Sequence, residues 1–266
     1  MTRSLVLALF AALLLAAPAS AGYPSTVAVQ GGQGIADGQL RYTAAKAGAD
    51  TRVSVVNAGA VVRSATVDGA FGIATLGVHD TGIGLFRDRS ALVLQSLSRP
   101  GTTTFRILKT GDLSVADTIT LEGIFAFDAL SPDGSTLYLV EHRSADDVEH
   151  YIVRAYDLAT HTLRPSRIAD KTQKTWVMQG FPAARASTAD GRWVYTMYVN
   201  PGGFPFVHAL DTVKGVAHCV GFNFRGDQSR LLNFRLGVKQ NTLVIRQSDL
   251  RVYRLIDRTT WAVRRK

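Results

Sequence analysis

The densest group of ionisable side chains lies in one short polar segment, residues 141–150 (EHRSADDVEH). Carboxylate oxygens are the ligands that Ca²⁺ prefers, and imidazoles such as those of His142 and His150 suit Zn²⁺. The segment lacks the spaced acidic positions and the turn glycine of a calcium loop, and Arg143 would repel a cation. We therefore expect a solvated loop without metal or cofactor, in which Glu141 and His142 remain candidates for contact with a ligand.

Charged residues also interrupt two apolar segments, each of which follows a glycine. Asp128 stands in the segment FAFDAL and Arg185 at the matching place in FPAARAS. On inward-facing strands these side chains can form a structural ion pair or bind a ligand in a channel, and both interpretations stay open. A nearby insertion, LGVHDTGIG, carries His79 and Asp80, which either cap the channel entrance or belong to an ordinary loop.

Other groupings do not form a catalytic centre. His208 and Asp211 are three residues apart on an expected strand, so their side chains point to opposite faces, and Asp211 is expected to cap a turn. Cys219, the only cysteine, stands in the apolar run VAHCV and is expected to be a small buried residue. No GxSxG, HExxH, phosphate-loop or dinucleotide motif is present.

A carbohydrate-active hydrolase or lyase is the enzymatic alternative. Glycosidases need two carboxyl groups about 5 to 9.5 Å apart. Asp128 is the one clear candidate on an inward-facing strand, because Arg185 takes the matching position in the next repeat. The sequence therefore favours a non-catalytic protein that binds an unidentified ligand or protein partner through its loop face and channel.

Basic residues are concentrated near the C-terminus. The whole chain has 30 Lys and Arg against 21 Asp and Glu, whereas residues 220–266 alone have 11 basic residues against 3 acidic ones, a net charge of +8. Such a region can attract an anionic cell-envelope polymer, with Arg251, Arg254 and Arg258 as candidate contacts, or its arginines can simply be solvated. Nucleic acid is not expected as a partner.

These residues must be positioned by short strands joined by tight turns. From Phe125 to Ile168 the sequence predicts four strands, the first two joined by the turn Ser131-Pro132-Asp133-Gly134. Four antiparallel strands of this kind make one blade of a β-propeller. The Asp turn recurs at five places, which are Asp37, Asp88, Asp133, Asp190 and about Gln240.

A second marker repeats in the same phase. Gly69, Gly123 and Gly180 each precede the expected first strand of a repeat, with Gly221 as a looser copy. The expected middle strands, such as LYLV at 137–140, are apolar on both faces, as sheets stacked between neighbouring sheets require. The pattern predicts an all-β fold, a β-propeller of five four-stranded blades, with six as the alternative. It leaves open whether Thr26 to Gln30 closes the ring by joining the last blade.

Four segments carry a family resemblance. They are FDALSPDG at 127–134, VRAYDL at 153–158, DGRWVYT at 190–196 and PFVHALDT at 205–212. They resemble the repeats of uncharacterised bacterial secreted proteins with WD-repeat-like β-propellers. The resemblance implies a binding scaffold and supplies no activity. The chain departs from eukaryotic WD repeats in lacking their Gly-His and Trp-Asp pairs, and its first, second and fifth turns are degenerate.

The N-terminal residues have the pattern of a secretory signal peptide. Arg3 precedes the apolar run Leu5 to Ala17, and small residues at 19–21 precede Gly22. The run is shorter than a membrane span of about 20 residues. We therefore expect a signal peptide at 1–21, followed by a single, monomeric propeller domain at 22–266 that is secreted or extracytoplasmic, with no membrane span in the mature chain.

Overall fold

The computed structural model describes residues 28–31, 34–76, 83–97, 101–170 and 177–266, which form five antiparallel sheets. The first sheet contains β2 (Ile35–Asp37), β3 (Leu40–Ala47), β4 (Asp50–Asn57) and β5 (Ala60–Val67). The second contains β6 (Phe71–Ala74), β7 (Ala91–Ser96), β8 (Thr102–Lys109) and β9 (Val115–Glu122), with β1 (Ala28–Val29) beside β6. The third contains β10 (Ile124–Leu130), β11 (Thr136–His142), β12 (His150–Asp157) and β13 (Thr162–Ile168), with β14 (Met178–Gln179) beside β12.

The last two sheets complete the same four-stranded pattern. The fourth contains β15 (Phe181–Ser187), β16 (Trp193–Val199), β17 (Phe206–Asp211) and β18 (Val216–Gly221). A 3₁₀ helix, η1 (Gln228–Asn233), leads to the fifth, which contains β19 (Arg235–Lys239), β20 (Thr242–Arg246), β21 (Val252–Asp257) and β22 (Val263–Arg264). The predicted all-β propeller with five four-stranded blades is confirmed.

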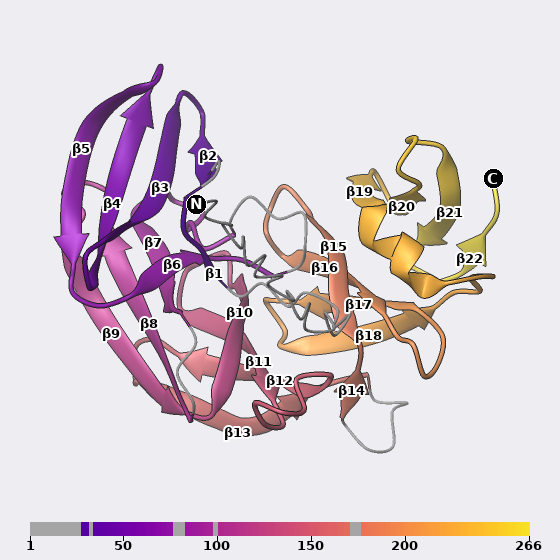
Figure 1. Ribbon diagram of the computed structural model, residues 1–266. Coiled ribbons are helices and arrows are strands. Elements are labelled where there is room, and N and C mark those ends of the chain that lie inside the picture. The colour runs from indigo at the N-terminus through magenta and orange to yellow at the C-terminus, as the bar shows by residue number, and fades with distance from the viewer. Residues whose placement is uncertain (1–27, 32–33, 77–82, 98–100, 171–176) are drawn as a thin grey trace, which may run out of the picture.

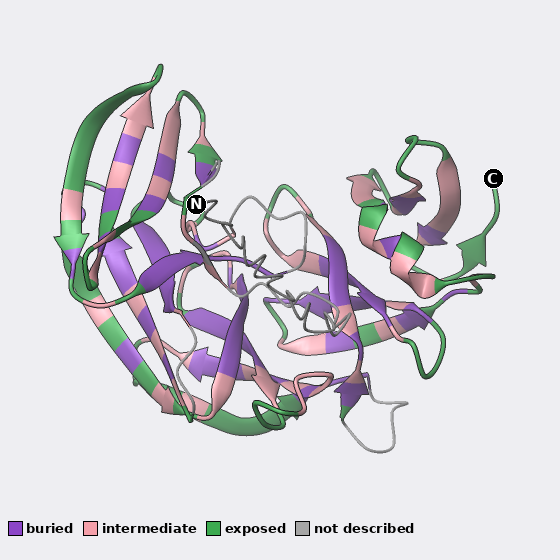
Figure 2. Ribbon diagram, in the orientation of Figure 1, coloured by how far each residue is buried: buried purple, intermediate pink, exposed green. Residues whose placement is uncertain are grey.

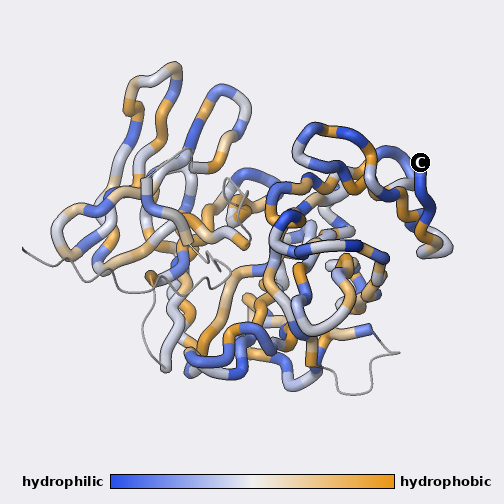
Figure 3. The backbone as a smooth tube through the Cα atoms, turned by 45° about the vertical axis from the view of Figure 1, so that its right-hand side comes forward, coloured by the Kyte–Doolittle hydropathy of each residue, from blue (hydrophilic) through white to orange (hydrophobic). Residues whose placement is uncertain are grey.

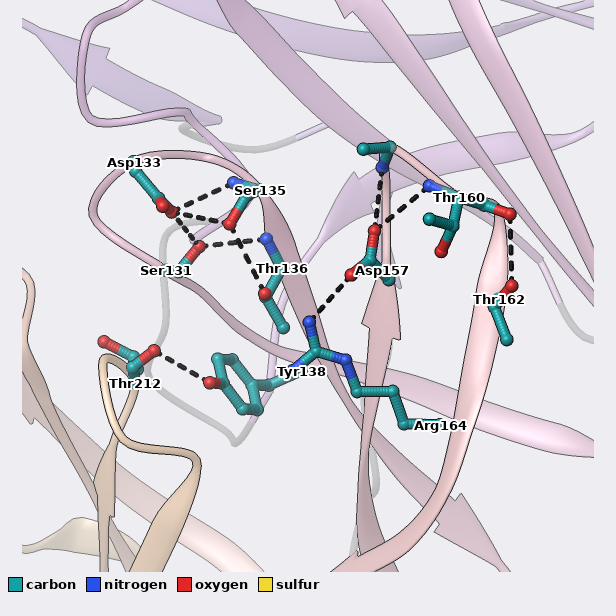
Figure 4. Close-up of polar contacts among 11 residues, drawn as sticks. Ser131, Asp133, Ser135, Thr136, Tyr138, Asp157, Thr160, Thr162, Arg164 and Thr212 are labelled. Carbon is teal, nitrogen blue, oxygen red and sulfur yellow. Dashed lines mark hydrogen bonds and ion pairs between the residues drawn. The ribbon is translucent and has the colours of Figure 1, made fainter.

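The recurrent turns join the first and second strands of each sheet, as predicted, with an aspartate in the first four sheets and Gln240 in the fifth. In the third sheet Asp133 Oδ1 accepts hydrogen bonds from the backbone amide and hydroxyl of Ser135 and from the hydroxyl of Ser131 (Figure 4). Gly134 follows with φ +72°, a left-handed conformation that glycine adopts without steric cost. Asp157 caps the turn between β12 and β13 in the same way, by accepting hydrogen bonds from the amides of Ala159 and Thr160. The aspartates at these positions therefore stabilise turns.

The five sheets follow one another along an arc, with the first and fifth at its two ends (Figure 1). Four buried apolar clusters each join one pair of consecutive sheets. On β11, Leu137 and Leu139 face the second sheet, whereas Tyr138 and Val140 face the fourth. This explains why the middle strands are apolar on both faces, and Figure 2 shows in purple that β7 and most of β11 are buried. Within the described ranges, no buried cluster joins the fifth sheet to the first.

The glycines that precede the first strands take part in contacts between sheets. Gly123 has φ +113°, and its carbonyl accepts a hydrogen bond from the hydroxyl of Thr103 on β8 at 3.0 Å. The same hydroxyl accepts from the backbone amide of Phe125 at 2.9 Å. Thr51 on β4 makes the equivalent pair of bonds with Gly69 and Phe71. One threonine hydroxyl thus bridges the first sheet to the entry strand of the second, and another bridges the second sheet to the entry strand of the third.

The first sheet is buried on one face only. Along β4, Val53 and Val55 pack against the second sheet, while Arg52 on the other face is exposed. The preceding strand, β1, pairs with β6 of the second sheet through Ala28 and Val29. These two residues therefore extend the second blade instead of joining the last one. Among the described residues, no helix is long and apolar enough to cross a membrane.

Candidate functional site

A cavity of about 450 Å³ lies where the inner strands of the first four sheets converge. Its walls come from β2, from the segment before β7, from β10 and β15, and from the Asp turns that follow β10 and β15. We call it the axial cavity. Among its described lining residues the charged ones are Arg87, Arg89, Asp128 and Arg185. The Asp turns and the inner strands thus meet at one site.

The structure brings the two predicted inner-strand residues together in this cavity. Arg185 Nη1 lies 2.8 Å from Asp128 Oδ1, and Arg185 Nη2 donates to the backbone carbonyl of Asp128 at 2.5 Å. Arg185 also donates to the hydroxyl of Thr196 at 2.9 Å. The two side chains are only 6% and 2% exposed. The pair therefore joins the third and fourth sheets, as the first of the two interpretations, a structural ion pair, predicts. The same two side chains also line the cavity.

The second oxygen of Asp128 distinguishes this site from a fully satisfied ion pair. Asp128 Oδ2 is buried and has no hydrogen-bond partner within the described part of the chain. A buried carboxylate oxygen without a donor costs free energy, so a hydrogen-bond donor brought by a ligand would be stabilising there.

Two arginines at the rim were not predicted. Arg87 Nη1 donates to the backbone carbonyl of Asp190 in the turn of the fourth sheet. Arg89 Nε lies 3.2 Å from Asp37 Oδ1 in the turn of the first sheet, with 56% of its side chain exposed. Both belong to the degenerate turn of the second sheet, residues 87–90, where the sequence shows RDRS in place of a Pro-Asp-Gly or Ala-Asp-Gly turn. This departure from the turn pattern was the one feature of the sequence that could have indicated Arg87 and Arg89 as site residues.

Next to each other on β17 and β18 lie His208, which is buried, and Cys219, which is only partly buried and not fully buried as the sequence predicted, and they have no catalytic geometry. His208 Nδ1 is 3.6 Å from Cys219 Sγ, and burial lowers the pKa of the histidine and raises that of the thiol to about 12. At neutral pH both groups are therefore uncharged, and the thiol is a poor nucleophile. Asp211 instead accepts from Arg192 and from the amides of its own turn, so it caps a turn as expected.

The acidic loop is separate from the axial cavity, at the other end of the β10–β11 hairpin. Glu141 lies 2.6 Å from Arg154 Nη1, and His142 Nδ1 lies 2.8 Å from the carbonyl of Val148. Burial lowers the pKa of His142. Both residues line a smaller cavity of about 230 Å³. Within the described ranges, no group of three or more His, Cys, Asp or Glu side chains could hold a metal ion.

The three C-terminal arginines do not converge. Arg251 Nε lies 2.6 Å from Asp249, and Arg258 donates to the hydroxyl of Tyr195 and so ties the fifth sheet to the fourth. Arg254 lies over the ring of Tyr253, its guanidinium carbon 4.0 Å from the ring centroid, and lines a different groove. His79 and Asp80 lie outside the described residues.

Comparison with known proteins supports the fold. No family model matches this chain, and neither does any curated protein. Among solved structures, hydrazine synthase from Kuenenia stuttgartiensis superposes with a TM-score of 0.55 at 16% identity, covering 83% of this chain and 62% of that one. A putative 6-phosphogluconolactonase from Bacteroides uniformis ATCC 8492 gives a TM-score of 0.50 at 16% identity, covering 87% and 68%. This chain thus spans about three-fifths of the hydrazine synthase chain, and likeness at this identity shows the fold alone.

Proposed function

We propose that the protein is a secreted, non-catalytic β-propeller that binds a small anionic ligand in the axial cavity. The observation that carries this proposal is the cavity itself, about 450 Å³, where three arginines and one carboxylate make up the charged lining in the described part of the chain. The carboxylate, Asp128, already pairs with Arg185 at 2.8 Å. At the rim Asp37 offsets the charge of Arg89 at 3.2 Å, whereas Arg87 donates to a backbone carbonyl and forms no ion pair among the described residues, so the remaining rim charge favours an anion.

Two contacts define the expected ligand. Guanidinium groups bind carboxylates and phosphates through paired N–H donors, so Arg87 and Arg89 would hold the anionic group. Asp128 Oδ2 lacks a donor but is closed off from solvent, so a hydroxyl or N–H group of the same molecule would donate to it after a small rearrangement of the surrounding side chains. A small hydroxylated acid, such as a sugar acid or a sugar phosphate, has both features.

The hydrolase alternative has less support. Its mechanism needs two carboxyl groups about 5 to 9.5 Å apart. Asp128 is the sole carboxylate among the described lining residues, and it is already engaged in an ion pair with Arg185 at 2.8 Å.

The test is a thermal-shift screen with named sugar acids and sugar phosphates, followed by calorimetry of each ligand that stabilises the protein. A ligand that binds only the folded state raises the melting temperature, and the stabilisation grows with the logarithm of the free ligand concentration above the dissociation constant. We expect the double variant Arg87→Gln, Arg89→Gln to lose this stabilisation. A matched control, Lys46→Gln with Arg52→Gln, removes two exposed charges from β3 and β4 and should keep it.

Two outcomes would contradict the proposal. In the first, a ligand binds the Arg87→Gln, Arg89→Gln variant as tightly as it binds the wild-type protein, which would mean that these two arginines do not hold it. Chemical conversion of the bound ligand, followed by NMR, would favour the hydrolase instead. Export can be tested separately, by locating the full-length protein after cell fractionation and sequencing its N-terminus.

A further inference from the structure

A second hollow in the surface lies between the fourth and fifth sheets, outside the axial cavity. Two cavities of about 430 and 710 Å³ share four lining residues, which are Phe204, Asn223, Arg254 and Arg265. Because they share these residues, the two cavities adjoin each other, and together we call them the C-terminal groove. Two adjoining hollows can hold consecutive units of one linear ligand.

The groove is positively charged. Five arginines line it, and they are Arg225, Arg230, Arg254, Arg264 and Arg265. Its described lining residues include no carboxylate, and none of the five arginines forms an ion pair within the ranges the structure describes. Asp227 interacts electrostatically with Arg230, and Asp257 with Arg264, but both carboxylates also accept hydrogen bonds from backbone amides of their own turns. Val263, Arg264 and Arg265 line the groove near the C-terminus, and the tube in Figure 3 is mostly blue, that is hydrophilic, close to the label C.

Arg254 is held in place at the centre of the groove. Its guanidinium lies over the ring of Tyr253, Nη1 donates to the carbonyl of Tyr253 at 2.7 Å, and Nη2 donates to the carbonyl of Asn223 at 3.1 Å. Behind it, Phe224 and Phe234 pack edge-to-face with Tyr253. A guanidinium fixed in this way loses little conformational entropy when it binds an anion.

One aromatic ring stays free for stacking. Phe204 is 70% exposed in the part of the groove that both cavities share, whereas Phe224, Phe234 and Tyr253 are partly or fully buried in the aromatic cluster. Binding of single-stranded nucleic acid relies on several aromatic faces for successive bases. A chain of sugar rings with regularly spaced charges needs the arginines and only one such face.

We propose that the C-terminal groove binds a linear acidic polysaccharide, with its carboxylates on the five arginines and one sugar ring against Phe204. This site is independent of the axial cavity, so it stands whether or not the proposed function of that cavity is correct. Arg254 is the only one of the three arginines predicted from the sequence that contributes to it.

The test measures binding of fluorescently labelled oligogalacturonate to the full-length protein by anisotropy at low salt. We expect the triple variant Arg225→Gln, Arg230→Gln, Arg265→Gln to bind at least about 30-fold more weakly, because each exposed charge contributes modestly and the effects add. Phe204→Ser should weaken binding by about threefold to tenfold. Raising the salt concentration should weaken wild-type binding steeply.

The matched control is Lys46→Gln, Arg52→Gln, Lys109→Gln, which removes the same charge from exposed positions on the first two sheets. It should bind within about threefold of wild type. Circular dichroism shows whether each variant is folded, and the three groove arginines substituted here are all exposed. The proposal is overturned if wild type does not bind oligogalacturonate, if the control weakens as much as the groove variant, or if labelled oligothymidylate of equal length binds more tightly.

Discussion

Arg185 of β15 and Asp128 of β10 form a buried ion pair with 2.8 Å between Nη1 and Oδ1, which ties the fourth sheet to the third at the wall of the axial cavity. Removing one partner leaves the other charged, buried and unpaired, which typically costs about 3–5 kcal/mol. We therefore expect Arg185→Met to lower the free energy of unfolding by about that amount in urea titrations.

The double variant Asp128→Leu, Arg185→Met checks the cause of this loss. It removes both charges, so it should recover much of the stability that Arg185→Met loses. A single variant that costs less than about 1 kcal/mol would show that water or a neighbouring group compensates the remaining charge.

The Thr103 hydroxyl is expected to stabilise the contact between the second and third sheets. Thr103→Val keeps the shape of the side chain but leaves the amide of Phe125 and the carbonyl of Gly123 without their partner. We expect a loss of about 1–3 kcal/mol in the free energy of unfolding. Thr118→Val, at an exposed position on β9, is the control and should change it by less than about 0.5 kcal/mol. Equal effects of the two substitutions would argue against the bridging role.

Gly180 should tolerate no side chain. A Cβ atom there would lie 2.5 Å from the carbonyl oxygen of Val199, and φ is +138°. We expect Gly180→Ala to cost more than about 3 kcal/mol or to prevent folding. Gly48 has φ +70° and open space around its Cβ position, so Gly48→Ala should cost only about 1 kcal/mol. Thermal unfolding of both variants measures the difference, and a similar loss for both would contradict the steric explanation.

Stability should fall in mildly acidic solution. Burial lowers the pKa of His208 and of His142 below the usual value of 6.5. For each histidine, at a pH between its lowered pKa in the folded state and its ordinary pKa in the unfolded state, the unfolded chain binds more protons than the folded one. The free energy of unfolding therefore falls as the pH drops below about 6.5. Each histidine contributes at most about 1.4 kcal/mol per pH unit.

Urea midpoints measured from pH 7 to pH 5 test this dependence. The double variant His142→Gln, His208→Gln has no imidazole at either position, so its midpoint should vary less with pH than that of the wild type. An unchanged slope would mean that other groups cause the loss.

The turns and first strands were predictable because their chemistry is local. The Ser131 to Gly134 turn needs an aspartate acceptor and a residue with positive φ, and both requirements are visible in consecutive residues. The pairing of Asp128 with Arg185 was one of two interpretations, because equivalent positions in successive repeats face the same axis.

The binding surfaces were less predictable because they combine distant segments. Arg87 reaches the turn at Asp190, 103 residues along the chain, and nothing near Arg87 indicates that contact. The C-terminal charge excess was visible as a count, but it did not distinguish Arg251, which pairs with Asp249, from Arg225 and Arg265, which line the groove. Only the packing of the fifth sheet on the fourth separates these roles.

The pairing of β1 with β6 also makes the first sheet a nested insertion. The chain leaves the second sheet after Val29, forms β2 to β5, and returns at Phe71, with Val29 opposite Ile73. The closure entropy of such an excursion grows slowly, by about 0.6 kcal/mol for each doubling of its length. The excursion could therefore be shortened, lengthened or lost in evolution without changing the strand connections of the four sheets that follow. The number of sheets in this architecture is then set by how much apolar surface each added sheet buries, and not by the route of the chain.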